Sequence, residues 1–484
     1  MINSKYLFWL LPILIFISQA IYTYASAVQI RLEEVIETFR SVWWFQNGLV
    51  WNGSYSFLGW YTTLAAVYNT FGMGIYTPKM VKLAIELVSY FCLAAVLRRY
   101  FSQNAWLPLL VIGLSPTFMY FNSLSLSMGL EVSYFFICLW LLVNLDFKKR
   151  IGSVISQILI WGLAMFAWLS YFGFIFYLPI LGAIFLYKLW QKYKLISTAW
   201  LKYLLILLVS FLTPLILLYL YTQNKQLLIL DPLSGKGLFR SFAKVELAPD
   251  VWFSNLRIIW RDLFVAPTSY YFEAFEVEFS DFYPVLTLAA VFVGCLLMIK
   301  TGKFRKLVIL LTATLIFYFL LISLVGPETL GGIRRGTVLL VIFYGLLAIV
   351  WDWTIRQKRL RWKYLLILGC SLILFHHAAV YPVNLGKIRQ ESVFREKWWF
   401  NSSQPERILA GYLRRAQESD VVLTCVEAGR ESFCPGISLI YPAIAGFCHW
   451  NNLSCRGIFF YESKSGQDVP VDIGLWGTGS HTEP

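Results

Sequence analysis

The chain has 484 residues, of which 58% are hydrophobic, 18% aromatic and only 14% charged. A soluble protein needs about 25% charged residues to cover its surface, so this composition excludes a water-soluble globular protein. The formal net charge is +14, but the basic residues lie in short clusters between apolar runs. A nucleic-acid-binding protein has a continuous basic patch or stripe. We therefore expect no nucleic acid as a partner and predict an integral membrane protein surrounded by a lipid bilayer.

The apolar residues form about eleven separate runs that are long enough for a membrane helix. A helix needs about 20 apolar residues to cross the hydrocarbon core of a bilayer. The first run lacks a convincing small-residue cleavage site and therefore predicts an uncleaved span rather than a signal peptide. The expected fold class is an all-α polytopic membrane protein. The predicted spans are residues 6–25, 80–97, 105–122, 128–145, 152–169, 172–189, 200–221, 283–299, 307–325, 337–353 and 364–380.

Basic residues cluster at alternate connections between these spans, so that six clusters fall on the same side of the membrane. The positive-inside rule assigns that side to the cytosol. We expect the chain to lie in a plasma (inner) membrane, with its amino terminus in the cytosol and its carboxyl terminus outside. The six clusters are Lys5, Arg98–Arg99, Lys148–Arg150, Lys188–Lys194, Lys300–Lys306 and Arg356–Lys363.

Three long segments are then extracytoplasmic: residues 26–79, residues 222–282 and the tail 381–484. The first two belong to a transmembrane domain that covers residues 1–380. The tail differs in composition, with a helix-like stretch followed by a strand-like run at 420–426. A chain of this length buries only a small core. We therefore expect the tail to be a small extracytoplasmic domain that is stapled by disulfides.

The eight cysteines divide into two groups by their surroundings. Four lie in apolar runs and are expected to be inert packing residues. The other four lie close together in the tail, where they predict two disulfides in an oxidising space or, as the alternative, a metal site. Zinc is disfavoured because no Cys-x-x-Cys pair occurs, and the disulfide pairing stays open. The apolar group is Cys92, Cys138, Cys295 and Cys370, and the tail group is Cys425, Cys434, Cys448 and Cys455.

The first outer segment carries acidic residues directly after the first span, among them Glu33 and Glu34. Further on, residues 57–72 are apolar and aromatic but short for a span, and a span there would invert every later connection. We therefore expect an amphipathic helix in the outer interface. A basic residue, Lys82, opens the next span, and the pair Arg98–Arg99 closes it.

Together these features resemble the GT-C superfamily of membrane glycosyltransferases, which includes the protein O-mannosyltransferases and the lipid A aminoarabinose transferase. The resemblance is clearest over residues 1–190. This chain departs from the family pattern in having Glu33–Glu34 where the family usually has Asp-Glu or a lone Asp. It also has Phe57-Leu-Gly59 where the family often has Pro-Pro. The first departure leaves both glutamates as candidates for the family's catalytic position.

The resemblance implies transfer of a hexosyl or pentosyl group, with inversion, from a polyprenyl-phosphate-linked sugar donor to an extracytoplasmic acceptor such as a glycan, a lipid or a protein. A carboxylate near the outer interface can act as general base for the acceptor hydroxyl. Glu33 is the first choice for this role and Glu34 the second. The alternative is that these carboxylates only solvate a helix end or pair with Arg31 and Arg40. No cofactor is expected, although an acidic run within residues 222–282 leaves a divalent cation open.

The departing lipid phosphate gains negative charge and needs cationic hydrogen-bond donors. The best candidates are Arg334 and Arg335, in the segment between the predicted ninth and tenth spans. Gly331–Gly332 allow close backbone approach there, and the start of the tenth helix favours an anion. Glu328 lies in the same segment and is counted with them as a substrate-binding candidate. The alternative is an arginine pair that snorkels to lipid headgroups.

Glu131 lies just inside the predicted fourth span and is a substrate-binding candidate, because ionisable residues within a membrane are costly and commonly functional. A helix–helix hydrogen bond is the alternative. His376 and His377 end the last span, where such a pair is expected to face the interface rather than bind a metal. Two other functions stay open: a transporter or flippase of a lipid-linked sugar, and a catalytically inactive GT-C-like scaffold. Transporters commonly contain internal repeats, and the sequence shows none.

Overall fold

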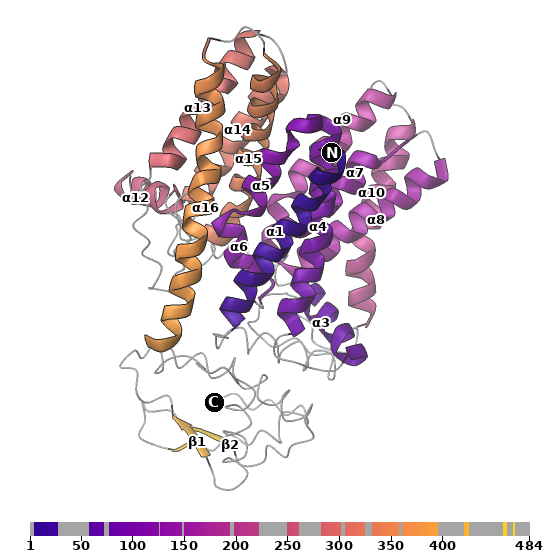
Figure 1. The fold of residues 1–484 in the computed structure, drawn as a ribbon. Helices are drawn as coiled ribbons and strands as arrows, with labels where there is room; N and C mark the ends of the chain where they lie inside the picture. Colours follow the sequence, from indigo (N-terminus) through magenta and orange to yellow (C-terminus); the bar gives the residue numbers. More distant parts are fainter. Residues whose placement is uncertain are drawn as a thin grey trace.

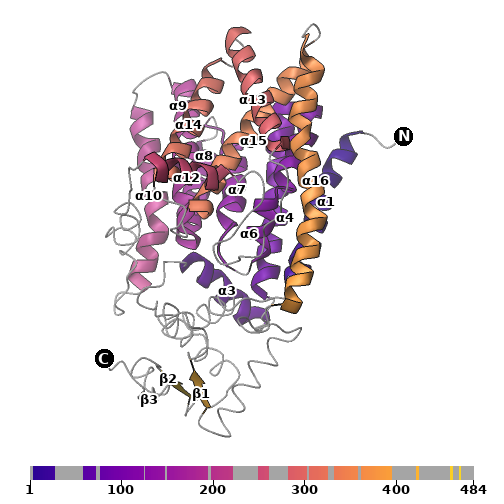
Figure 2. The same ribbon diagram turned by 90° about the vertical axis from the view of Figure 1, so that its left-hand side faces the viewer.

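The protein, seen in a computed structural model, consists of a helical bundle and a small β-sheet (Figure 1). Most helices run along one long axis, and a second view at a right angle shows the same elongated bundle (Figure 2). The structure describes residues 4–27, 58–71, 77–124, 126–147, 150–193, 198–221, 249–260, 282–301, 305–324, 332–357, 361–394, 421–424, 458–461 and 468–469.

Two sets of helices form the bundle. The first set is α1 (Ser4–Ala27), α3 (Leu58–Phe71), α4 (Thr77–Phe101), η1 (Ser102–Ala105), α5 (Trp106–Gly113), α6 (Pro116–Ser123), α7 (Leu130–Asn144), α8 (Arg150–Ser170), η2 (Phe172–Phe176), α9 (Leu178–Tyr193) and α10 (Thr198–Tyr221). The second set is α12 (Pro249–Trp260), α13 (Phe282–Thr301), α14 (Arg305–Leu324), α15 (Gly332–Arg356) and α16 (Lys363–Phe394). The two sets meet where α15 and α16 pack on α5 and where α16 packs on α1.

Among the residues that the structure describes, eight helices are long and apolar enough to cross a membrane. Large apolar side chains are exposed on their surfaces, for example Phe292 and Phe317, as a lipid solvent requires. These helices coincide with eight of the predicted spans, and they identify the chain as a multi-pass membrane protein. They are α1, α4, α8, α9 with the preceding η2, α13, α14, α15 and α16.

The other three predicted spans are not confirmed, and the total of eleven stays a prediction. Helix α7 has only 15 residues, and the apolar part of α10 that qualifies covers Leu201–Thr213. The prediction of one continuous helix at 105–122 is wrong. The range is occupied by η1, α5 and α6, and the helical conformation is interrupted at Ser115, between α5 and α6. Pro116 has no N–H group and disfavours a helical conformation in the residue before it. Ser115 accordingly has φ −58° and ψ 121°.

Helix α16 is longer than predicted. It has 32 residues and includes Pro382, so it continues beyond the expected end of the span at residue 380. The first part of the predicted tail, residues 381–394, is therefore helical. The Tyr381 hydroxyl donates a hydrogen bond to the Ser18 carbonyl oxygen at 2.9 Å, which ties this extension to α1.

Helix α3 lies within the range predicted for an interfacial helix. It has 14 residues, too few to cross a bilayer, and it lies at one end of the bundle (Figures 1 and 2). It packs against α8 and α4, while Thr62 and Phe71 are exposed. The helix is amphipathic, because its buried side chains recur at helical spacing. They are Trp60, Tyr61, Leu64, Ala65 and Tyr68.

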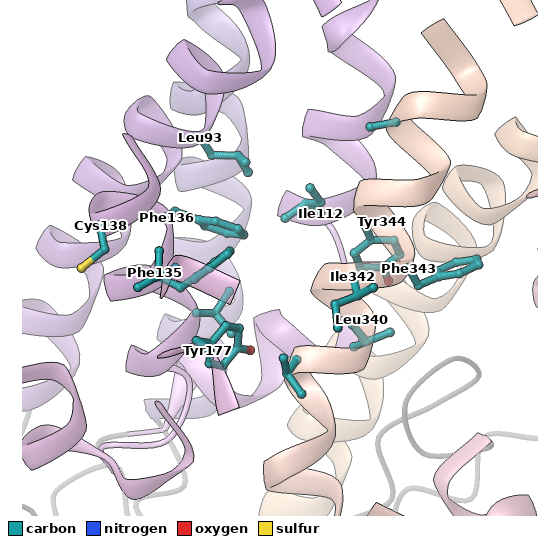
Figure 3. Packing of buried hydrophobic residues seen from close by; sticks show 14 of the residues in the cluster. Leu93, Ile112, Phe135, Phe136, Cys138, Tyr177, Leu340, Ile342, Phe343 and Tyr344 are labelled. Atoms are coloured by element: carbon teal, nitrogen blue, oxygen red, sulfur yellow. The ribbon is translucent and has the colours of Figure 1, made fainter. Parts of the chain in front are cut away.

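The interior is built mainly from aromatic and branched aliphatic side chains. Figure 3 shows Phe135, Phe136 and Tyr177 on one side of the interior and Leu340 and Ile342 of α15 on the other. The rings of Phe135 and Tyr177 lie 4.9 Å apart between centroids, within the range of favourable aromatic pairs. The four cysteines of the apolar group are buried and free, which fits a packing role.

Three short strands form a mixed sheet in the C-terminal tail: β1 (Val421–Thr424), β2 (Ile458–Tyr461) and β3 (Asp468–Val469). β1 pairs in parallel with β2, and β2 pairs antiparallel with β3. β1 falls within the predicted strand-like run at 420–426. The four tail cysteines lie outside the described residues, so the disulfides stay a prediction.

Gly59→Ala is expected to loosen the packing of α3 on α8. A Cβ atom at Gly59 would lie within 2.7 Å of the Phe166 carbonyl oxygen and 2.9 Å of the Ser170 main-chain nitrogen. Overpacking of this kind costs about 1–3 kcal/mol, which the thermal unfolding temperature of the purified protein in detergent measures. Gly182→Ala is the matched control, since nothing lies within 4 Å of a Cβ there. An unchanged unfolding temperature for G59A would contradict the close contact.

Candidate functional site

Helix α4 carries a stripe of polar side chains on the face that it turns to the interior. Lys79, Lys82, Glu86 and Tyr90 follow one another at three- or four-residue spacing, which places them on one face of a helix. All four are buried. An ionisable side chain inside a membrane protein is costly unless it is paired or hydrogen-bonded. The hydrogen-bond partners of these side chains therefore show whether each one has a structural role or is available for a ligand.

The Lys82 ammonium is held by main-chain oxygens of the connection between α6 and α7. The three N–H groups of its Nζ atom are shared among four carbonyl oxygens, those of Phe121 (2.7 Å), Leu124 (2.9 Å), Leu126 (3.0 Å) and Met128 (2.5 Å). The carbonyl dipoles take the place of water around the cation, and the cation supplies donors to carbonyl groups in a turn between helices. The arrangement makes Lys82, one of the residues that carry the family resemblance, a structural residue.

Two further contacts shape the same connection. Lys79 Nζ donates to the Ser123 carbonyl oxygen at 3.0 Å. Gly129 enters α7 with φ +91°, a left-handed conformation that favours glycine. A Cβ atom at Gly129 would lie 2.3 Å from Asn122 Oδ1. The connection from Phe121 to Gly129 is therefore packed closely and leaves no room for a side chain at its last residue.

Glu131 lies in the first turn of α7 and is buried. Its Oε2 atom accepts a hydrogen bond from the Gly129 main-chain N–H at 2.7 Å, and its Oε1 atom accepts one from Thr337 Oγ1 at 3.1 Å. The Tyr177 hydroxyl donates in turn to Thr337 Oγ1 at 3.0 Å. The first bond satisfies a main-chain donor at the start of the helix. The second is a helix–helix hydrogen bond, the role that the sequence left open as the alternative for Glu131.

These hydrogen bonds bring the starts of α7 and α15 together. Helix α15 begins at Gly332, so Thr337 lies in its second turn. Arg334 and Arg335 lie in its first turn, three and two residues before Thr337. Their side chains are outside the described set. Two of the predicted phosphate-binding residues and Glu131 therefore belong to neighbouring ends of two packed helices.

The other predicted site residues fall outside the described part of the chain. They are the general-base candidates Glu33 and Glu34 and the substrate-binding candidate Glu328. Much of the second outer segment, at 222–248 and 261–281, falls outside it as well. Within the described ranges, no group of three or more His, Cys, Asp or Glu side chains could hold a metal ion. A divalent cation at the acidic run of the second outer segment is neither supported nor contradicted.

The prediction that His376 and His377 face the membrane interface is wrong. Both side chains are 1% exposed. His377 Nε2 lies 3.4 Å from the Tyr344 hydroxyl, which also donates to Ser115 Oγ at 3.2 Å. The pair is buried because α16 does not end there but continues to Phe394, so that the two histidines lie in the middle of a packed helix.

Sequence reasoning missed Glu86. It stands four residues after Lys82 in an apolar span, and this spacing is the signal that could have found it, because it places an acid and a base on one face of a membrane helix. Glu86 is fully buried, and Lys82 interacts electrostatically with both Glu86 and Glu131. With Lys79, the group contains two bases and two acids and has no net charge when all four are ionised. A group of buried charges with no net charge avoids much of the desolvation free energy that an isolated buried charge would cost.

The opposite end of α7 is also closed by a side chain from another helix. Lys188 of α9 donates through Nζ to the carbonyl oxygens of Leu142 (2.9 Å), Val143 (2.8 Å) and Leu145 (2.9 Å). The last carbonyl groups of a helix lack partners within it, and a lysine there also interacts favourably with the helix dipole. Helix α7 is thus held at its start by Thr337 and at its end by Lys188.

Comparison of the chain with protein-family models, with curated proteins and with solved structures finds no match. The resemblance to the GT-C superfamily therefore stays a sequence-based expectation.

Lys82→Met is expected to lower the free energy of unfolding by about 3–5 kcal/mol, because it leaves four buried carbonyl groups without this donor and removes the counter-charge of two glutamates. Thermal or denaturant unfolding of the purified protein in detergent measures the loss. Lys202→Met is the matched control, since Lys202 is exposed on α10, and its unfolding temperature is expected to stay nearly unchanged. Equal effects of the two substitutions would rule out the structural role of Lys82.

Proposed function

We propose that the chain is a membrane glycosyltransferase that moves a hexosyl or pentosyl group from a polyprenyl-phosphate-linked donor to an extracytoplasmic acceptor. The observation that carries the proposal is the hydrogen bond from Thr337 to Glu131 at 3.1 Å. It sets the second turn of α15, next to the turn that carries Arg334 and Arg335, beside a buried polar site. A lipid-linked sugar combines a polar head with an apolar chain, and a polar site enclosed by lipid-facing helices suits both parts.

The start of α15 is the proposed phosphate site. Arg334 and Arg335 lie there, and arginine is well suited to bind phosphate through paired hydrogen bonds. The first main-chain N–H groups of the helix and its dipole add to the attraction for an anion. Lys82 does not share this task in the proposal, because its ammonium is bound by carbonyl oxygens. The positive-inside pattern of the sequence predicts that this end of α15 is extracytoplasmic.

The proposed reaction is a displacement at the anomeric carbon of the donor. The oxygen of an acceptor hydroxyl attacks this carbon from the face opposite the phosphate, so the configuration inverts. A new carbon–oxygen bond forms as the bond to the phosphate oxygen breaks, and the electron pair of that bond stays on the polyprenyl phosphate. The proton of the acceptor hydroxyl passes to Glu33, or to Glu34, as the general base. Arg334 and Arg335 stabilise the charge on the departing phosphate.

Transport of a lipid-linked sugar is the second candidate function, and one observation favours it. The predicted third span is broken at Ser115, between α5 and α6. Broken helices near buried polar groups are common in secondary transporters. In this alternative the donor crosses the membrane intact and no covalent bond changes.

Reconstitution into liposomes separates the candidates. The probes are radiolabelled polyprenyl-phosphate mannose, glucose and arabinose, with cell-envelope extract as the source of acceptors. Release of free polyprenyl phosphate, with the label passing to the acceptor fraction, supports the transferase. Movement of the intact donor between leaflets supports the flippase. An inactive scaffold does neither.

Glu33→Gln or Glu34→Gln is expected to lower the rate of transfer by about 10²–10⁴-fold, the usual contribution of a general base. The measured quantity is the rate at which polyprenyl phosphate is released in the liposomes. Glu37→Gln, in the same outer segment, is the matched control and is expected to keep transfer near the native rate. Full activity in both E33Q and E34Q, with normal membrane insertion, would remove these carboxylates from the mechanism.

A further inference from the structure

Three buried residues on α4 and α6 carry side-chain atoms without hydrogen-bond partners among the described residues. These atoms are both carboxylate oxygens of Glu86, the hydroxyl of Tyr90 and Oδ1 of Asn122. Buried polar groups are nearly always hydrogen-bonded, and an unpaired one costs about 1–3 kcal/mol. A group of such atoms in one place points to a ligand or to water that supplies the missing partners.

The three residues lie close to one another and to the Glu131 site. Tyr90 follows Glu86 by one turn of α4. Its hydroxyl interacts electrostatically with the Glu86 carboxylate and lies close enough to the Asn122 side chain for a hydrogen-bond interaction. Asn122 Oδ1 lies against Gly129, whose main-chain N–H bonds to Glu131. These three residues therefore extend the Glu131 site to the facing sides of α4 and α6.

The surrounding charges restrict what can bind. When all four groups are ionised, Lys79 and Lys82 balance Glu86 and Glu131, so a further cation or anion would leave a net charge in a buried place, which is costly. What the three residues lack is hydrogen-bond donors, because a carboxylate and a carboxamide oxygen only accept hydrogen bonds. The fitting ligand is therefore uncharged and rich in hydroxyl groups.

We infer that Glu86, Tyr90 and Asn122 form a subsite for the hydroxyl groups of a neutral sugar ring. The inference rests on the proposed function: it assigns the sugar of the donor to these residues and its phosphate to the start of α15. The Glu86 oxygens accept hydrogen bonds from two ring hydroxyls, and Asn122 Oδ1 accepts one from a third. The Tyr90 hydroxyl donates to a ring or hydroxyl oxygen. The subsite prefers neutral sugars to uronic acids and amino sugars, because a charged sugar disturbs the balance of two acids and two bases.

The test compares lipids that differ only in the sugar. The native protein in nanodiscs is titrated with bare polyprenyl phosphate, with polyprenyl-phosphate glucose and mannose, and with polyprenyl-phosphate glucuronate. The thermal unfolding temperature gives an apparent dissociation constant for each lipid. The native protein is expected to bind the neutral sugar lipids more tightly than the bare and the acidic ones.

Two variants probe the subsite. Tyr90→Phe keeps the buried ring and removes only the hydroxyl, which forms no hydrogen bond of good geometry, so its folding is expected to be native. It should weaken binding of the neutral sugar lipids about five- to tenfold and leave the bare lipid unaffected. Glu86→Gln should weaken binding of the same lipids by about tenfold, because an NH₂ donor replaces one of the two oxygens that accept from the ring hydroxyls. Tyr203→Phe, at a buried tyrosine of α10, is the matched control and should change neither affinity.

The outcomes distinguish this subsite from the proposed function. If the native protein prefers neutral sugar lipids but Y90F and E86Q keep that preference, the subsite is wrong, the three residues bind internal water, and the proposed function stands. If the native protein binds no polyprenyl-phosphate lipid, the proposed function fails. Free glucose and mannose are then the probes: stabilisation that both variants abolish upholds the subsite, and its absence overturns it.

Discussion

The hydrogen bonds between the Lys82 ammonium and the connection from α6 to α7 fix the arrangement on which the polar site depends. The bonds join residues that lie 39 to 46 positions apart in the sequence, and they hold the turn that leads into α7. That turn sets the Gly129 N–H against the Glu131 carboxylate, and Glu131 in turn meets Thr337 of α15. A single buried cation thus organises contacts among four helices.

The charges of the interior explain how a lipid-facing bundle tolerates so many ionisable groups. Two lysines and two glutamates share one region, and their charges cancel when all four are ionised, which keeps the region polar without a net charge. In the proposed function, two different parts of the site therefore bind the phosphate and the sugar. Positive charge for a phosphate comes from Arg334 and Arg335 at the helix start, and hydroxyl recognition comes from the balanced region.

The sequence could predict the features that depend on local patterns. Eight spans follow from apolar runs, because each is a property of about twenty consecutive residues. Pro116 is a sequence signal for the interruption of the helix at Ser115. The prediction of a continuous span gave more weight to the long apolar run than to this proline. The burial of His376 could not be predicted, because it depends on how far α16 continues. Glu131 accepts a hydrogen bond from Thr337, which is 206 positions away in the sequence. A local sequence pattern cannot predict a contact between residues so far apart. The proposed base and much of the second outer segment lie outside the described residues.

The closure of α7 by side chains from other helices has a consequence for biogenesis. With 15 residues and a carboxylate in its first turn, α7 is a poor segment to enter lipid alone. Its final carbonyl groups meet Lys188 only after α9 has been synthesised, and Glu131 meets Thr337 only after α15 has emerged from the ribosome. Until then α7 must stay against α4, its earliest packing partner. The polar centre is therefore completed late, and a chain truncated before α15 would expose it to the quality control of the membrane.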